Sequence, residues 1–255
     1  MADGYDQLTP DVVRPLLRGR LGTPYRWSPE CASTQDVLHD VELPEGAVAV
    51  TEHQTGGRGR SGRAWEDVAG RSLLASLLLR PAAGAPAEQL SLVTGLAVAE
   101  AIDRVAGVRS ELKWPNDVLV GEAKVAGILL ESARSGVVCG VGVNVDHEAT
   151  ELPDGTRLRP TSLRAVTGRR HDRAALLAEL LLALERHYDT WGASGLAPLL
   201  PALEARHALR GARVRIGAVT GVVGPIAPDG RLSLTRDDGS AVLVASGEAQ
   251  VLGST

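Results

Sequence analysis

The feature that most constrains how this chain can fold is a run rich in glycine and arginine, residues 52–65, that separates two apolar runs. It reads EHQTGGRGRSGRAW and holds four glycines and three arginines. The apolar runs, residues 47–51 and 72–80, are typical of buried strands. Glycine lets a backbone approach a ligand closely, and arginine offers a planar fork that matches carboxylate and phosphate oxygens. A solvated basic loop is the alternative, but the position between two core strands favours an anion-binding loop.

Length and composition indicate one large and one small domain in a globular protein. The 255 residues can bury a full core, and 44% of them are hydrophobic. No apolar run reaches the roughly 20 residues that span a bilayer, and the first residues lack the features of a secretory signal. Cys31 and Cys139 form neither a disulfide framework nor a metal-ligand spacing, so we expect reduced thiols in a cytoplasmic protein.

The balance of charge limits the classes of partner. The net charge of −4 argues against a general nucleic-acid binder, so any recognition of anions should be local. The residues before Ser33 leave no room for a helix-turn-helix module, and we expect no DNA-binding domain. Of the 27 basic residues only two, Lys113 and Lys124, are lysine. Two residues can cluster by chance, but a compact ammonium suits a site that needs a point charge.

The middle of the chain predicts alternating helices and strands. A helical period of apolar residues predicts a helix over residues 88–105, and alternation predicts a hairpin of residues 117–120 and 124–130. Pro115 predicts a bend at residues 113–117, and residues 137–145 are typical of a buried strand. A long helix is expected over residues 173–191, with Asp172 as its cap and Gly192 as its end.

Two shorter features are expected near the amino terminus. Residues 11–20 are typical of a short helix. Ser33 and Asp36 fit a capping box at the start of another helix, with Ser33 at the N-cap. Alternatively, the hydroxyls of Ser33 and Thr34 bind a polar ligand group there.

Short β-like runs predict a second, small domain at the carboxyl end. The runs ARVRI, VTGVVGPIA, RLSLT, AVLVA and EAQVL are divided by turn signals such as Pro228-Asp229-Gly230. This pattern is typical of a small β-barrel. We therefore expect a larger domain over residues 1–208 and a barrel over residues 209–255.

Three segments carry candidate chemistry: the loop of residues 52–65, KWPND with KVAGILLE (residues 113–117 and 124–131), and GVGVN (residues 140–144). Separately, each has an ordinary structural explanation. Together with Ser33-Thr34 and Gln54, and in this order, they closely resemble the biotin protein ligases over about residues 30–252. The combination of GRGRxGRxW, KWPND and KxAGIL is highly specific.

The resemblance implies an α+β fold and a two-step reaction. The fold is a mixed β-sheet packed with helices, of the class II aminoacyl-tRNA synthetase and biotin ligase type, plus a C-terminal SH3-like β-barrel. The carboxylate of biotin attacks the α-phosphate of ATP, bound with Mg²⁺, to give biotinyl-5′-AMP. A lysine amine on the biotin carboxyl carrier protein domain of an acetyl-CoA or acyl-CoA carboxylase then displaces AMP. The implied form is a monomer or weak homodimer that binds neither DNA nor membrane.

The resemblance also implies the site residues. Bringing a carboxylate to a polyphosphate opposes like charges, so a cationic site is needed, and Lys124 and Arg58 are the expected catalytic residues. The expected biotin contacts are Ser33, Thr34, Gln35, Gln54, Arg58, Gly59, Arg60, Lys124, Gly127 and Gly142. The expected contacts of ATP and the adenylate are Arg60, Arg63, Trp65, Lys113, Asn116 and Asn144, with Asp117 as the candidate Mg²⁺ ligand. For Lys113, orienting the bend or pairing with a carboxylate is an equal alternative.

Two departures and two rival functions qualify the resemblance. The family usually shows Ser-Thr-Asn where this chain has Ser33-Thr34-Gln35, and Ser61 stands where a basic residue is frequent. Lipoate ligases and octanoyltransferases share the fold but characteristically lack the GRGRxGRxW loop. A biotin-sensing regulator without catalysis would need a DNA-reading element and would not need Lys124. The sequence therefore predicts a monofunctional biotin protein ligase, and it leaves open whether its basic loop is ordered without ligand.

Overall fold

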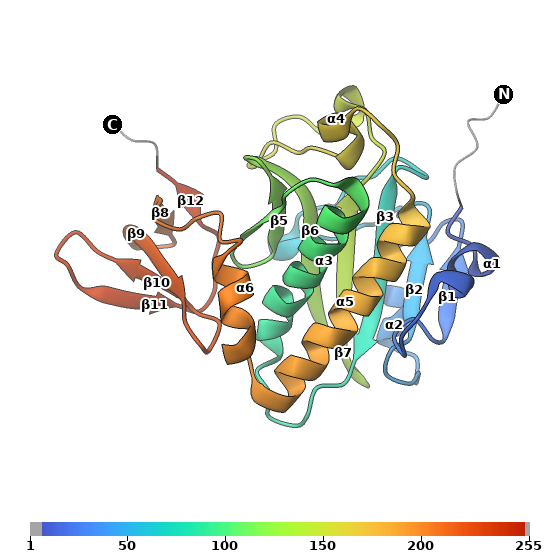
Figure 1. The fold of residues 1–255 in the computed structure, drawn as a ribbon, viewed down its shortest axis with the longest axis horizontal. Helices are drawn as coiled ribbons and strands as arrows, with labels where there is room; N and C mark the ends of the chain where they lie inside the picture. Colours follow the sequence, from blue (N-terminus) through green and yellow to red (C-terminus); the bar gives the residue numbers. More distant parts are fainter. Residues whose placement is uncertain (1–6, 253–255) are drawn as a thin grey trace.

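The larger part of the protein is built on a seven-stranded mixed sheet (Figure 1). The structure is a computed structural model that describes residues 7–252. The strands are β1 (Tyr25–Ser28), β2 (Val48–Thr51), β3 (Ser72–Leu79), β4 (Glu111–Lys113), β5 (Asp117–Val120), β6 (Ala123–Ala133) and β7 (Gly136–Asn144). Their order across the sheet is β1-β2-β3-β7-β6-β5-β4. Only β1 and β2 pair in parallel, and the remaining pairs are antiparallel, which confirms the predicted mixed sheet.

Two long helices, α3 (Leu90–Ala106) and α5 (Arg173–Ser194), pack side by side against one face of this sheet (Figure 1). Their apolar side chains and those of the strands form one buried core. The shorter helices are α1 (Pro10–Val13), α2 (Asp36–His39), α4 (Leu163–Thr167) and α6 (Leu200–Glu204). Single 3₁₀ turns are η1 (Arg14–Leu16), η3 (Ala87–Gln89), η4 (Ala149–Glu151) and η5 (Ala197–Leu199). The segment labelled η2 (Arg60–Gly62) is a tight turn with non-helical φ and ψ at Ser61.

The local signals in the sequence explain most of these elements. The predicted hairpin is β5 and β6, with Gly121 at a φ of 60° in its turn. The predicted strands before and after the basic loop are β2 and β3, and the predicted glycine-bearing strand is β7. At the start of α5 the side chain of Asp172 accepts a hydrogen bond from the backbone N–H of Ala175, as expected of a cap.

Three details of the sequence-based description are wrong. Helix α5 continues through Gly192 and ends before Gly195. Gly195 has the positive φ that ends a helix, whereas Gly192 does not. Ser33 is not an N-cap: α2 begins at Asp36, and Gln35 occupies the N-cap position without a side-chain cap bond. The expected helix over residues 11–20 is only α1 followed by η1, since Pro15 interrupts the helical bonding.

The carboxyl-terminal part is a separate five-stranded antiparallel sheet, at the left of Figure 1. It contains β8 (Arg213–Ile216), β9 (Val219–Ile226), β10 (Leu232–Thr235), β11 (Ala241–Val244) and β12 (Gln250–Val251) in the order β11-β10-β9-β8-β12. The sheet lies against the larger part, where the indole N–H of Trp114 donates to the carbonyl of Gly230 at 3.1 Å. Strands β11 and β12 lie at opposite edges, so the pairing describes an open sheet and the predicted closed barrel stays a prediction.

Within residues 7–252, no helix combines the length and apolarity that a membrane crossing requires. The prediction that the chain lacks a secretory signal rests partly on residues 1–6. These residues lie outside the described residues. The same is true of residues 253–255, the end of the predicted second domain.

Candidate active site

A cavity of about 330 Å³ lies between the basic loop and the surface of β6 and β7. Its size is in the range of small-molecule sites. The cavity collects every site residue predicted from the sequence except Lys113. These residues are Ser33, Thr34, Gln35, Gln54, Arg58, Gly59, Arg60, Arg63, Trp65, Asn116, Asp117, Lys124, Gly127, Gly142 and Asn144.

The loop that covers the cavity has a defined hairpin backbone. The N–H of Gly59 donates to the carbonyl of Arg63 at 2.7 Å, and the N–H of Trp65 donates to the carbonyl of Gly57 at 2.9 Å. At the tip, Ser61 and Gly62 have φ values of 59° and 74°, the combination found in a type I′ turn. A Cβ at Gly57 would lie 2.4 Å from the Trp65 carbonyl oxygen, so the two limbs require glycine to come this close.

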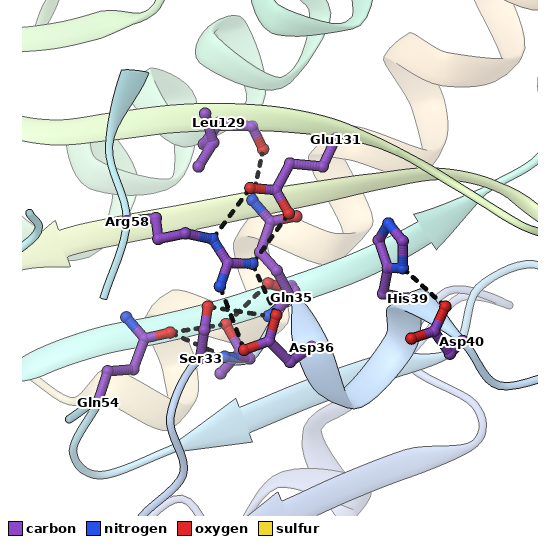
Figure 2. Close-up of polar contacts among 11 residues, drawn as sticks. Ser33, Gln35, Asp36, His39, Asp40, Gln54, Arg58, Leu129 and Glu131 are labelled. Carbon is purple, nitrogen blue, oxygen red and sulfur yellow. Dashed lines mark hydrogen bonds and ion pairs between the residues drawn. The ribbon is translucent and has the colours of Figure 1, made fainter. Parts of the chain in front are cut away.

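The three arginines of the loop each bind a partner from a different segment. Arg58 lies between two carboxylates, Asp36 and Glu131 (Figure 2). The guanidinium of Arg60 donates to the side-chain oxygen of Asn116 at 2.9 Å. Arg63 forms an ion pair with Glu248 at 2.9 Å. The basic loop is therefore held in place by protein groups around the cavity.

Glu248 connects the carboxyl-terminal sheet to the cavity. Its carboxylate binds Arg63 at 2.9 Å and Arg157 at 3.0 Å. Burial acts to raise the pKa of Glu248, but the Arg63 hydrogen bond and the charges of both arginines lower it below the ordinary value. A residue from the carboxyl-terminal part of the chain thus lines the cavity and holds two of its arginines in place.

Lys124 lines the cavity next to Trp65. Its ammonium binds the carboxylate of Asp117 at 2.6 Å and stands 5.5 Å from the centre of the Trp65 ring. The ring rests on a pair of glycines, Gly127 and Gly142, which are opposite each other in the β6–β7 register. A Cβ at Gly142 would lie 2.6 Å from the ring, so glycine is needed for this packing.

The other end of the cavity is lined by uncharged polar groups. The backbone N–H of Thr34 donates to the side-chain oxygen of Gln54 at 2.8 Å, and the Thr34 hydroxyl pairs with that of Ser76 at 2.7 Å. Gln35 donates its amide N–H to the carbonyl of Leu129 at 3.3 Å (Figure 2). The amide oxygen of Gln35 is buried and has no hydrogen-bond partner among the described residues. A ligand N–H at this end would satisfy it.

Lys113 is the predicted site residue that the structure places elsewhere. It ends β4, is 4% exposed and is not among the residues that line the cavity. Burial lowers its pKa, although Asp117 and Glu248 act in the opposite direction. This position favours the structural alternative that the sequence left open.

Known proteins resemble both the sequence and the fold. Residues 29–147 match the model of the biotin/lipoate A/B protein ligase family. The chain is 35% identical over 179 residues to the bifunctional ligase/repressor BirA of Bacillus spizizenii, a match that covers 66% of this chain and 54% of that protein. It is 37% identical over 217 residues to the biotin–[acetyl-CoA-carboxylase] ligase of Mycobacterium tuberculosis, covering 80% of this chain and 78% of that protein. The chain belongs to the biotin protein ligase family.

A solved structure of the family supports the same alignment in three dimensions. The biotin protein ligase from Aquifex aeolicus, in complex with biotin and ATP, superposes with a TM-score of 0.82 at 31% sequence identity. The superposition covers 89% of this chain and 98% of that one. This match confirms the predicted biotin ligase-like fold.

Several residues of the candidate site were not predicted from the sequence. The missed residues that line or brace the cavity are Asp36, Ser76, Glu131, Arg157 and Glu248. The sequence analysis interpreted Asp36 only as a helix-capping residue. The others are ordinary surface or strand residues in the sequence, and only the fold brings them to the loop.

The described residues do not form a metal site of their own. No cluster of three or more potential metal ligands occurs within residues 7–252. The carboxylate of Asp117, the candidate Mg²⁺ ligand, is already paired with Lys124. Mg²⁺ is commonly bound by one or two carboxylates together with substrate phosphates, so a resident protein cage is not required for ATP chemistry.

Proposed function

We propose that this protein is an ATP-dependent ligase that activates biotin as biotinyl-5′-AMP and transfers it to a lysine of a biotin carboxyl carrier protein domain. The observation that carries the proposal is the division of one cavity into two ends. Ser33, Thr34, Gln35 and Gln54 offer uncharged hydrogen-bonding groups at one end, and Arg60, Arg63 and Lys124 offer positive charge at the other. A neutral cyclic urea with a carboxylate tail, followed by a nucleotide, matches this order of groups.

In the first step a carboxylate oxygen of biotin forms a bond to the α-phosphorus of ATP. The bond from that phosphorus to the bridging oxygen of the β-phosphate breaks, and pyrophosphate leaves. The negative charge that develops around the α-phosphate is stabilised by the ammonium of Lys124. Asp117 binds that ammonium at 2.6 Å and keeps it at the cavity before substrate arrives.

In the second step the neutral amine of the acceptor lysine attacks the carbonyl carbon of the mixed anhydride. The bond from that carbon to the phosphate oxygen breaks, AMP leaves, and the nitrogen loses one proton to the solvent as the amide forms. Until then the adenylate must be protected from water, and the hairpin of residues 57–65 covers the cavity in which it forms.

Contacts to the nucleotide are proposed for Trp65, Asn116 and Asn144. The ring of Trp65 offers a flat surface for adenine. The side-chain oxygen of Asn116 accepts from Arg60 and its amide donates to the carbonyl of Ile128, so this residue also fixes the arginine. Asn144 donates to the carbonyl of Thr161 at 3.0 Å, which leaves its side-chain oxygen directed to other partners.

Further parts of the proposal concern domains, ions and partners. We propose catalytic residues 1–208 and a small domain of residues 209–255 that closes as an SH3-like barrel, supported by the antiparallel strands that begin at Arg213. Mg²⁺ enters as part of the substrate MgATP, with Asp117 as the nearest proposed ligand. The acceptor is the carrier domain of an acetyl-CoA or acyl-CoA carboxylase. The protein works in the cytoplasm as a monomer or weak homodimer, and its net charge of −4 does not favour DNA.

One assay tests the function directly. Purified protein with MgATP should release pyrophosphate when biotin is added and not when lipoate is added. Lys124→Ala should lower the rate of adenylate formation by about 100- to 1000-fold, the usual cost of removing one group that stabilises a developing anion. Arg134→Ala, which removes an exposed charge at the far β6–β7 turn, is the matched control and should have no effect. A folded preparation that releases no pyrophosphate with biotin would refute the proposal.

A further inference from the structure

Arg58 is held by two carboxylates that come from opposite sides of the loop. Its Nη2 donates to Asp36 at 2.8 Å and to Glu131 at 3.0 Å, its Nη1 donates to Asp36 at 3.2 Å, and its Nε donates to Glu131 at 3.1 Å (Figure 2). Asp36 is the first residue of α2, and Glu131 lies in β6. We call these three residues the carboxylate bridge. It joins the loop to a helix start and to the sheet at the same point.

The bridge leaves Arg58 with little capacity to bind a substrate anion. A guanidinium has five N–H donors, and its Nε and both Nη atoms are already engaged by the two carboxylates. The hydrogen bonds to Asp36 and Glu131 raise the pKa of Arg58 further above its ordinary value. One positive and two negative charges give the group a net charge of −1. A biotin carboxylate or an ATP phosphate would be repelled rather than attracted by this group.

The bridge is attached to the segments that line the polar end of the cavity. Asp36 follows Gln35, whose unpaired amide oxygen lines that end. Glu131 is two residues beyond Leu129, whose carbonyl accepts from Gln35. The two carboxylates therefore belong to the same two segments that hold Gln35 in place. Arg58, which belongs to the basic loop, lies between these two carboxylates (Figure 2).

The other end of the loop is attached by different groups. Arg60 binds Asn116, and Arg63 binds Glu248 of the small domain. Breaking the carboxylate bridge would consequently loosen the cover over the polar end and leave the attachments of the cationic end intact. Binding of the group that enters the polar end is the property that should change.

We propose that Asp36 and Glu131 are positioning residues that hold the loop closed over the urea ring of biotin through Arg58. This inference rests on the proposed function, because it takes biotin as the ligand of the polar end. It assigns Arg58 to retention of biotin and of the adenylate, and not to stabilisation of charge at the α-phosphate. The affinity for biotin and the lifetime of bound biotinyl-5′-AMP should depend on the bridge. The chemical step should not.

The test compares Asp36→Asn, Glu131→Gln and the double variant with wild type. Asp40→Asn is the matched control. Asp40 is the C-cap of α2, at the opposite end of that helix from Asp36, its side chain is 89% exposed, and it pairs with His39 (Figure 2). Each bridge variant should weaken biotin binding about fivefold and speed the release of biotinyl-5′-AMP by about the same factor, as for loss of a part-exposed ion pair worth about 1 kcal/mol. The rate of adenylate formation at saturating biotin should stay within about twofold of wild type.

Salt dependence gives a readout that a purely structural effect would not move. Raising the salt concentration from about 0.1 to 1 M shortens the screening length from about 10 to 3 Å and should weaken biotin binding by wild type. The double variant has no carboxylate left to screen and should show a smaller response. Arg58→Lys should resemble the single variants, because one ammonium does not present a planar fork to two carboxylates.

The outcomes separate the inference from the function on which it rests. If wild type does not bind biotin, the proposed function fails. If wild type binds biotin and the bridge variants match Asp40→Asn in affinity and adenylate release, the inference is overturned. It is equally overturned if the variants bind biotin normally but form the adenylate slowly, because the bridge would then act in the chemistry. Thermal midpoints of all variants establish that each one is folded.

Discussion

Adding one methyl group at Gly142 is the sharpest test of how the centre of the cavity is packed. A Cβ built there lies 2.6 Å from Cε2, 2.7 Å from Cζ2 and 3.0 Å from Nε1 of Trp65. Comfortable carbon contacts need about 3.5–4.0 Å, so the ring must move by roughly 1 Å. Overpacking of this kind costs about 1–3 kcal/mol. Since Trp65 belongs to the covering loop, the cost should fall on the closed loop rather than on the core.

The Gly142→Ala variant should therefore bind its substrates weakly while remaining stable. A cost of about 1–3 kcal/mol corresponds to a rise of roughly 5- to 150-fold in the apparent dissociation constant for ATP or biotin. The assays are pyrophosphate release as a function of each substrate and a thermal unfolding curve. The thermal midpoint should change by less than the 2–4 °C that about 1 kcal/mol produces in a protein of this size.

A double-mutant cycle identifies Trp65 as the cause. In a Trp65→Ala background the methyl group meets no ring, so Gly142→Ala should add little further loss of affinity. Unchanged substrate affinity in the single variant, or full additivity in the double variant, would refute the packing of Trp65 on Gly142.

Three further predictions concern stability. Arg173→Met breaks a buried ion pair with Glu52, 2.8 Å long. The variant should lose about 3–5 kcal/mol of the free energy of unfolding, measured by urea titration. A loss below about 1 kcal/mol would contradict this prediction. Burial lowers the pKa of His147 to about 4 from an ordinary 6.5, so between these pH values the unfolded chain binds a proton that the folded one does not. Stability should be complete above pH 6.5 and should fall by about 2 kcal/mol at pH 5, and His147→Gln should flatten this slope. Gly192 lies at an exposed helical position where a Cβ meets nothing within 4 Å. Gly192→Ala should therefore raise the free energy of unfolding by about 0.5–1 kcal/mol in the same titration. No gain would show that this turn of α5 is frayed.

The sequence predicts well those elements whose cause is local. The β5–β6 hairpin follows from alternation around Gly121, and α3 and α5 follow from an apolar period of helical length. The same locality explains the errors. Gly192 has the residue type of a helix end, but only the backbone distinguishes it from Gly195, whose φ is 68°. The prediction assigned Ser33 to capping on spacing alone, whereas α2 starts three residues later.

The candidate site also contains a local part, which the sequence predicts, and a long-range part, which it does not. Residues in short motifs, such as Lys124 and Trp65, could be found from the sequence because the motif is contiguous. The contacts that organise them join residues far apart: Arg58 reaches Asp36 over 22 positions and Glu131 over 73, and Arg63 reaches Glu248 over 185. No pattern within one segment encodes such a pair, since either partner alone is an ordinary charged residue. These contacts become visible only when the sheets bring the segments together.

The different contacts of Arg58 and Lys124 suggest why a chain with so few lysines has one in this cavity. Arginine suits the places where one side chain must hold two partners at once, as Arg58 holds Asp36 and Glu131 through a rigid fork. Lys124 instead has one carboxylate partner, Asp117, and a ring face below it. An ammonium with a single partner on a flexible stem can turn toward a phosphate without releasing the loop, whereas a bridging guanidinium cannot. The cation that meets the reacting atoms should therefore be the lysine, and the arginine of the bridge should keep the cavity closed around them.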